Sequence, residues 1–262
     1  MSGAGSGLVA HGLELGYGDR VVSRGLDLAL PPGRFTAVIG PNACGKSTLL
    51  RALARLQPLR AGRVELDGAD LAHQRPRQVA RRVGFLPQRM VPPEGITVTQ
   101  LVRRGWFPHR SWRAVWSDQD EAAVRRALAD AGVEDLAARR VEELSGGQAQ
   151  RAWMAMVLAQ ETDLLLLDEP TTFLDIAHQY ELLGLLARLR DGGRTVVAVL
   201  HEVNQACRFA DHVVAMSEGR VVAQGPPGEV VTAPLVREVF GLAADVVPDP
   251  LTGTPMLVPH PV

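Results

Sequence analysis

The sequence predicts an α/β fold: a mostly parallel sheet with an antiparallel β edge and an inserted α-helical segment. Two observations lead to this fold class. Short apolar runs bounded by turn residues alternate with stretches whose leucines recur at helical spacing, which is typical of a parallel sheet covered by helices. The stretch 89–160 has a helical character throughout and interrupts that alternation.

The predicted strands are short apolar runs at 35–39, 83–86, 164–167 and 195–200. Such continuous runs are expected of strands that are buried on both faces. Two further runs, 213–216 and 220–223, flank Gly219 and predict a hairpin at the edge of the sheet.

The predicted helices follow from periodicity and capping. One helix begins after Gly45 and carries Leu49, Leu50, Leu53 and Leu56 at helical spacing, and another covers 176–189. In the middle segment, Ser117 with Asp120 three residues later predicts a capped helix start, and Gly132 predicts the end of that helix.

We expect a single domain over 1–262, since no repeat or low-complexity tract divides the 262 residues. Its core would comprise 8–88 and 161–240, its helical subdomain 89–160, and a short C-terminal extension 241–262.

Composition excludes several classes of protein. A net charge of −1 argues against non-specific electrostatic binding of nucleic acid. Two cysteines are too few for a disulfide framework or a four-cysteine metal site, so a reducing compartment is the default. Neither a secretory signal nor an apolar run near the ~20 residues of a membrane span is visible. We expect a soluble chain that reaches a membrane only through a protein partner.

The segment 40–47, Gly-Pro-Asn-Ala-Cys-Gly-Lys-Ser, fits the pattern Gly-x4-Gly-Lys-Ser/Thr between a predicted strand and a predicted helix. Its glycines let backbone N–H groups turn toward phosphate oxygens, and the helix N-terminus adds a positive dipole. Lys46 would reach the β- and γ-phosphates, and the Ser47 hydroxyl would ligate Mg²⁺. Lys46 is also the only lysine, against 27 arginines, which suggests a task that a guanidinium cannot perform.

The predicted strand 164–167 ends in two acids, Asp168 and Glu169. The carboxyl ends of strands in such sheets face the ligand crevice. Asp168 could hold Mg²⁺, mostly through water, and Glu169 could orient or deprotonate an attacking water.

The segment 144–148, Leu-Ser-Gly-Gly-Gln, lies between these two motifs and resembles the signature sequence of ATP-binding-cassette ATPases. The resemblance covers about residues 8–240 and implies a P-loop NTPase (RecA-like) core that binds ATP and Mg²⁺. It also implies a head-to-tail dimer of two copies, in which the signature of one subunit caps the ATP held by the other. Ser145, Gly146, Gly147 and Gln148 would supply that cap, with Asp175 at the dimer seam.

The resemblance assigns further roles. Tyr17 would stack on adenine, Gln88 would contact Mg²⁺ and the attacking water, and His201 would contact the γ-phosphate. Glu169, His201 and Gln88 are therefore the expected catalytic residues, and Ser47, Gln88 and Asp168 the expected metal ligands. The complete set of expected ATP contacts from the same chain is Tyr17, Gly40, Pro41, Asn42, Ala43, Cys44, Gly45, Lys46, Ser47 and Thr48.

Sequence around the motifs, including 171–179 and 200–207, resembles the ATPase subunits of ferric-siderophore importers. This resemblance implies a peripheral protein at the cytoplasmic face of the bacterial inner membrane. Its partners would be integral membrane permease subunits and, indirectly, an extracytoplasmic substrate-binding protein, with no nucleic acid. ATPases for cobalamin or haem import, soluble cassette ATPases without a permease, and a non-catalytic nucleotide-binding scaffold stay open as alternatives.

The tryptophan-rich stretch 106–116 has two interpretations. Exposed Trp106, Trp112 and Trp116 would form a docking surface for the permease, since aromatic residues are enriched at interfaces. Buried, they would be ordinary core residues.

Overall fold

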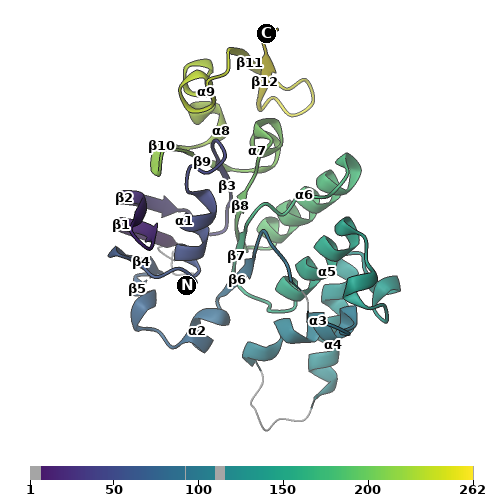
Figure 1. Ribbon diagram of the computed structural model, residues 1–262. Helices are drawn as coiled ribbons and strands as arrows, with labels where there is room; N and C mark the ends of the chain where they lie inside the picture. Colours follow the sequence, from purple (N-terminus) through teal and green to yellow (C-terminus); the bar gives the residue numbers. More distant parts are fainter. Residues whose placement is uncertain (1–6, 92, 110–115, 262) are drawn as a thin grey trace, which may run out of the picture. The chain divides into compact units, whose positions relative to one another are not determined.

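The computed structural model describes residues 7–91, 93–109 and 116–261 (Figure 1). Its contacts divide the chain into two compact units, one formed by 1–74 and 187–262 and the other by 75–186. The second unit includes all of the predicted helical subdomain 89–160, whose bounds stay a prediction.

The strands of the first unit belong to three sheets. Strands β3 (Phe35–Ile39), β8 (Thr195–Val199) and β9 (His212–Ser217) are parallel, with β3 in the centre, and β10 (Arg220–Gly225) pairs antiparallel with β9. Every residue of β3 is buried, as a continuous apolar run predicts. These strands and the β9–β10 hairpin confirm the predictions made from the apolar runs.

A second sheet of this unit is antiparallel, in the order β2-β1-β4-β5, and was not predicted. Its strands are β1 (Leu8–Tyr17), β2 (Arg20–Leu30), β4 (Ala61–Leu66) and β5 (Ala69–Asp70). The 3-10 turn η1 (Leu71–His73) follows β5.

Helices complete the first unit. Helix α1 (Lys46–Leu53) follows β3, and α7 (Val203–Phe209) follows β8. Helices α8 (Pro227–Val230) and α9 (Ala233–Phe240) lead to the hairpin β11 (Ala244–Pro248) and β12 (Pro255–Pro259). Asn204 of α7 joins this hairpin, because its amide bonds both the N–H and the C=O of Leu257.

The second unit pairs β6 (Val83–Leu86) in parallel with β7 (Leu164–Leu167), as predicted. Around them lie α2 (Pro76–Ala80), α3 (Val98–Gly105), α4 (Asp118–Asp130), α5 (Gly146–Leu158) and the larger part of α6 (Ile176–Asp191). Three 3-10 turns, η2 (Phe107–His109), η3 (Glu134–Leu136) and η4 (Val141–Glu143), join them. The capping box at Ser117 and the left-handed Gly132 bound α4 as predicted.

One expectation about a side chain was wrong, and one open alternative can be narrowed. Helix α1 ends at Leu53, and Leu56 is 61% exposed, because Arg55 adopts a left-handed conformation that stops the helix. Of the two interpretations of the stretch 106–116, core packing holds for Trp106, which is buried and stacks on His109. Trp116 is half-buried under Arg103 and donates to Glu121, whereas Trp112 lies outside the described residues.

Throughout the described part of the chain, helices are too short or too polar to cross a bilayer.

Candidate nucleotide-binding site

The loop between β3 and α1 has the backbone that its glycines predict. Gly40 has φ 151° and Gly45 has φ 109°, which L-residues with side chains rarely adopt. A Cβ on Gly40 would lie 2.2 Å from the carbonyl oxygen of Met216. Glycine is therefore required at position 40 for both conformation and space, and the loop turns tightly into the N-terminus of α1.

Lys46 is the first residue of α1 and is only 5% exposed. Its Nζ donates to the carbonyl oxygens of Gly40, at 2.9 Å, and Pro41, at 2.7 Å. A buried ammonium is tolerable only with such partners. The two hydrogen bonds place a positive charge against the loop that would cradle the phosphates.

The turn between β9 and β10 supports this loop. The N–H of Gly219 donates to the carbonyl oxygen of Cys44 at 2.9 Å. Cys44 is 6% exposed, and burial raises the pKa of its thiol. Cys44 therefore packs as a small neutral side chain that faces the fold.

The remaining predicted contacts of the loop lie around α1. Thr48 is buried in the first turn, and its Oγ1 lies 3.4 Å from the hydroxyl of Tyr17. Tyr17 is 45% exposed, so its ring is accessible for stacking. Ser47 is half-buried, and Asn42 and Ala43 are exposed.

His201 belongs to the same unit. It follows β8 after Leu200 and precedes α7, and its side chain is exposed. The expected position at the carboxyl end of a parallel strand is thus confirmed, whereas its catalytic role stays a prediction.

In the second unit, Asp168 and Glu169 follow β7 directly. Asp168 is fully buried, and its N–H donates to the carbonyl oxygen of Leu86, which extends the pairing of β7 with β6. Glu169 is half-buried, and its Oε2 accepts hydrogen bonds from Gln88 Nε2, at 2.7 Å, and from Thr172 Oγ1, at 3.3 Å. The structure therefore brings together two predicted catalytic residues, Gln88 and Glu169.

Glu169 also has a strained backbone, with φ 53°. A non-glycine residue in the left-handed region costs on the order of 1–3 kcal/mol and persists only where its surroundings enforce it. Such strain gathers at functional sites, and here it fixes the direction of a carboxylate.

Two residues that support Glu169 were not predicted. Thr172 holds its carboxylate, and Gln150 is a buried polar side chain that donates to the carbonyl oxygen of Pro170 at 2.8 Å. Gln150 fastens the loop after Glu169 to α5. Thr172 lies in the stretch 171–179 that carries the resemblance, but that resemblance assigned a role to neither residue.

The segment 145–148 begins α5. Ser145 is the N-cap: its Oγ accepts from the N–H of Gln148, and Gln148 Oε1 accepts from the N–H of Ser145. Ser145 and Gly146 are exposed. Gly147 packs closely, since a Cβ there would lie 3.3 Å from Leu174. The exposed N-terminus of α5 is a second place where an anion is favoured.

Asp175 immediately precedes α6 and is exposed. Its Oδ1 accepts from the backbone N–H of His178 at 2.9 Å and lies 2.8 Å from Nδ1 of the same ring. The bonds from His178 hold the pKa of the Asp175 carboxyl below its usual value. In this unit Asp175 has a local task, which is to cap α6.

Each unit also contains a cavity. In the second unit, a cavity of about 610 Å³ is lined by Gln88, Gly146, Trp153, Thr172 and Phe173, among others. The cavity therefore extends from Gln88 and Thr172, the two hydrogen-bond partners of Glu169, to the first turns of α5.

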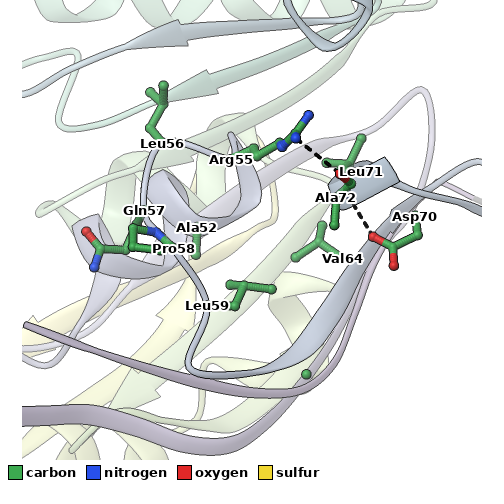
Figure 2. A pocket seen from close by; sticks show the side chains of 11 residues that line it. Ala52, Arg55, Leu56, Gln57, Pro58, Leu59, Val64, Asp70, Leu71 and Ala72 are labelled. Carbon is green, nitrogen blue, oxygen red and sulfur yellow. Dashed lines mark hydrogen bonds between the residues drawn. The ribbon is translucent and has the colours of Figure 1, made fainter. Parts of the chain in front are cut away.

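The cavity of the first unit, about 480 Å³, lies at the opposite end of α1 from the glycine loop (Figure 2). There Arg55 donates to the carbonyl oxygen of Ala72, and Asp70 accepts from the N–H of the same residue. None of the predicted site residues lines this cavity.

The donor set proposed for Mg²⁺ was Ser47, Gln88 and Asp168. All three offer oxygen atoms, which are the ligands that Mg²⁺ prefers, usually with phosphate oxygens and water. The described residues contain no cluster of three His, Cys, Asp or Glu side chains that would form an all-protein cage. This chemistry fits Mg²⁺ bound together with a nucleotide.

Comparison with known proteins gives consistent results. The family model described as ABC transporter matches residues 23–172. The ferric enterobactin transport ATP-binding protein FepC of Escherichia coli is 52% identical over 94% of this chain and 92% of its own length.

Two solved structures are similar to this chain. A chain of an inward-facing ABC transporter, described as of the metal-chelate type, matches with TM-score 0.83 and 28% identity over 98% of both chains. The dimeric cassette MJ0796, bound to ADP and Pi, matches with TM-score 0.75 and 25% identity over 84% of this chain and 98% of its own.

Proposed function

We propose that this chain, which belongs to the ABC transporter family, is the ATPase subunit of a bacterial importer for an iron–siderophore complex. The chain is an ATPase of that family. What we propose is that it serves an importer and that the imported cargo is an iron–siderophore complex. The name of the E. coli relative and the description of the inward-facing structure support an iron-chelate cargo. The ATPase would act at the cytoplasmic face of the inner membrane, on permease subunits served by an extracytoplasmic binding protein.

The observation that best supports ATP hydrolysis here is the hydrogen-bonded pair of Gln88 and Glu169. Glu169 would accept a proton from the attacking water, which then bonds to the γ-phosphorus while the bond to the β–γ bridging oxygen breaks. ADP and phosphate leave. Gln88 would keep the carboxylate aimed, and His201 would contact the γ-phosphate.

The phosphates would be bound by the backbone N–H groups of the loop at 40–45 and by Lys46. Mg²⁺ bound through Ser47, Gln88 and Asp168 would neutralise charge on the β- and γ-phosphate oxygens.

The second anion site, at Ser145–Gly147, supports a dimer in which each nucleotide contacts two copies of the chain. One chain rarely needs two helix N-termini for one triphosphate. Ser145 and Gly146 are exposed and so accessible to another subunit. ATP binding would close the dimer, hydrolysis would reopen it, and motion passed through Gln88 would switch the permease between its inward- and outward-facing states.

Replacing Glu169 with Gln tests the catalytic assignment. We expect the turnover of ATP to fall at least about a hundredfold, since a positioned general base contributes roughly 10²–10⁴ in rate. Binding of ATP should persist, because the amide keeps the size of the side chain. Steady-state phosphate release and nucleotide titration measure the two quantities.

The matched control is Glu181→Gln, the same change at an exposed position of α6. It should hydrolyse ATP at the wild-type rate. Near-wild-type turnover in the Glu169 variant would remove Glu169 from the mechanism. The transport function needs its own experiment, ATP-dependent uptake of a ferric siderophore into vesicles that contain the permease, and uptake without added ATP would contradict it.

A further inference from the structure

Positive charge is concentrated in one part of this nearly neutral chain. Residues 71–109 contain seven arginines and one carboxylate, Glu94, which gives this segment a formal charge of +6. The whole chain has a net charge of −1, so the rest carries −7. The ATP-site residues do not account for this asymmetry, since Gln88 is the only one of them in the segment.

The structure gathers several of these arginines over η2. Arg77 lies in the first turn of α2, and Arg81 directly follows the helix. Both are exposed, and their Nε atoms donate to the carbonyl oxygen of Pro108, at 2.9 and 2.8 Å. Arg75, just before α2, is exposed as well. Two guanidinium groups that share one acceptor must lie close together, despite their repulsion.

Phe107, the residue before Pro108, is 71% exposed. It follows α3, whose last turn contributes the exposed Arg104. We call Arg75, Arg77, Arg81, Arg104 and Phe107 the basic face. An exposed aromatic ring among arginines is typical of proteins that bind at a membrane interface, where the ring enters the acyl boundary and the cations meet phosphates.

A carboxylate neutralises one neighbour of this face, Arg103. Arg103 pairs with Glu121 at 2.7 Å and is therefore excluded from it. Asp120 accepts from Trp106 and from the N–H of Ser117.

We propose that the basic face binds the anionic phospholipid surface of the membrane on which this ATPase works. The proposal rests on the peripheral location given under the proposed function. Charge complementarity selects lipid over a permease loop, because the cytoplasmic loops of membrane proteins carry an excess of Lys and Arg and would repel these arginines. The negative surface potential of the cytoplasmic leaflet attracts them.

Lipid binding by this face would keep the cassette at the membrane surface and orient it before it meets the permease. Because the attraction decays within a Debye length of about 10 Å at 0.1 M salt, binding should weaken steeply as salt is added.

Vesicle sedimentation of the purified full-length chain, without permease, tests the proposal. The probes are vesicles of phosphatidylglycerol mixed with phosphatidylcholine and vesicles of pure phosphatidylcholine. We expect the wild type to bind the anionic vesicles at low salt and to ignore the neutral ones. The triple variant Arg75→Gln, Arg81→Gln and Arg104→Gln should partition at least about tenfold less, since each arginine near an anionic surface contributes a factor of roughly five.

The matched control removes the same charge elsewhere: Arg20→Gln, Arg24→Gln and Arg220→Gln are exposed positions of the first unit. It should bind like the wild type. Phe107→Ser, which leaves the charge unchanged, should also bind less. Circular dichroism and ATPase activity in solution confirm that each variant is folded.

Three results would overturn the proposal: no preference of the wild type for anionic vesicles, equal losses in the two triple variants, or wild-type binding by Phe107→Ser. Failure of the proposed function is distinguishable from these. If the chain hydrolyses ATP but does not bind vesicles, only the proposal of lipid binding is wrong. If it binds vesicles but does not hydrolyse ATP, only the enzymatic assignment is wrong.

Discussion

Lys46 lies where its compact ammonium can bond two neighbouring carbonyl oxygens at once, those of Gly40 and Pro41. An arginine carries the same charge on a wide planar group that needs more space and a different donor geometry. The position is almost fully buried, so that space does not exist without moving the loop. This explains physically why the chain keeps its single lysine among 27 arginines.

Replacing Lys46 with Arg should therefore weaken ATP binding by at least about tenfold although the charge is preserved, because a misplaced cation loses charge-assisted hydrogen bonds of roughly 1.5–3 kcal/mol. Isothermal titration with ATP measures the loss. The control Arg51→Lys, a charge-preserving change later in the same helix, should bind ATP normally. Equal affinity of wild type and Lys46→Arg would show that charge alone matters at this position.

Residues that contact phosphate, metal or water could be predicted from the sequence because their chemistry restricts both residue type and spacing. The side chains behind them could not. Gln150 holds a loop and Thr172 holds a carboxylate. Many polar residue types at many positions can make such hydrogen bonds, so no fixed sequence pattern marks them. The cap formed by Ser145 and Gln148 follows the Ser-x-x-Gln pattern of a capping box, so it could have been predicted from the sequence.

At the scale of elements, the β9–β10 hairpin matters to the site because its turn touches the glycine loop. Glu218 and Gly219 both have positive φ, 48° and 75°, as a two-residue hairpin turn of the favoured type requires. Gly219 is also pressed against β2, since a Cβ there would lie 1.8 Å from the carbonyl oxygen of Val22.

Gly219→Ala and Gly253→Ala form a matched pair. Both glycines have nearly the same φ, 75° and 71°, but a Cβ on Gly253 meets nothing within 4 Å. We expect Gly253→Ala to cost only the conformational strain, about 1–2 kcal/mol. Gly219→Ala should cost clearly more and should also weaken ATP binding, because the turn must move away from Cys44. Urea unfolding measures both, and equal losses would contradict the close approach.

Buried strands could be predicted because an apolar run of four or five residues between turn residues is too short for most helices and fits a buried strand. The sheet β2-β1-β4-β5 was missed although β2 has a readable alternation, with Leu26, Leu28 and Leu30 buried and Asp27 and Ala29 exposed. The hairpin β11–β12 was also missed, since its five-residue strands contain prolines at their ends, which disfavour strands in a sequence.

On the scale of the whole molecule, stability should depend on the protonation of His212. This ring is half-buried at the start of β9, its Nδ1 has no hydrogen-bond partner among the described residues, and burial holds its pKa below the ordinary 6.5. The unfolded chain therefore takes up a proton at higher pH than the folded chain. Its contribution to stability is complete above pH 6.5 and is lost as the pH falls from 6.5 toward the pKa of the folded state.

Replacing His212 with Leu should remove this dependence. Between pH 6.5 and the folded pKa, the free energy of unfolding of the wild type should change by up to about 1.4 kcal/mol per pH unit more than that of the variant. Urea unfolding over a series of pH values provides the comparison. His73→Leu, at an exposed histidine, should keep the wild-type slope, and a wild-type slope in His212→Leu would contradict the role of this burial.

Also at this scale, the described residues offer two places that favour an anion, the phosphate loop before α1 and the exposed N-terminus of α5 at Ser145. The account therefore requires two copies for each nucleotide. The sequence could suggest this only through family resemblance, because nothing in the pattern of one chain encodes which surface of another it meets.

Light scattering of the Glu169→Gln variant, with and without ATP and Mg²⁺, tests this requirement most directly. The account predicts the mass of one chain without nucleotide and of two chains with it. Adding Ser145→Arg should keep the chain monomeric with ATP while leaving ATP binding to the monomer intact, since the bulky side chain would obstruct only the partner's nucleotide. A monomer with bound ATP in the first variant, or an unchanged dimer in the second, would contradict it.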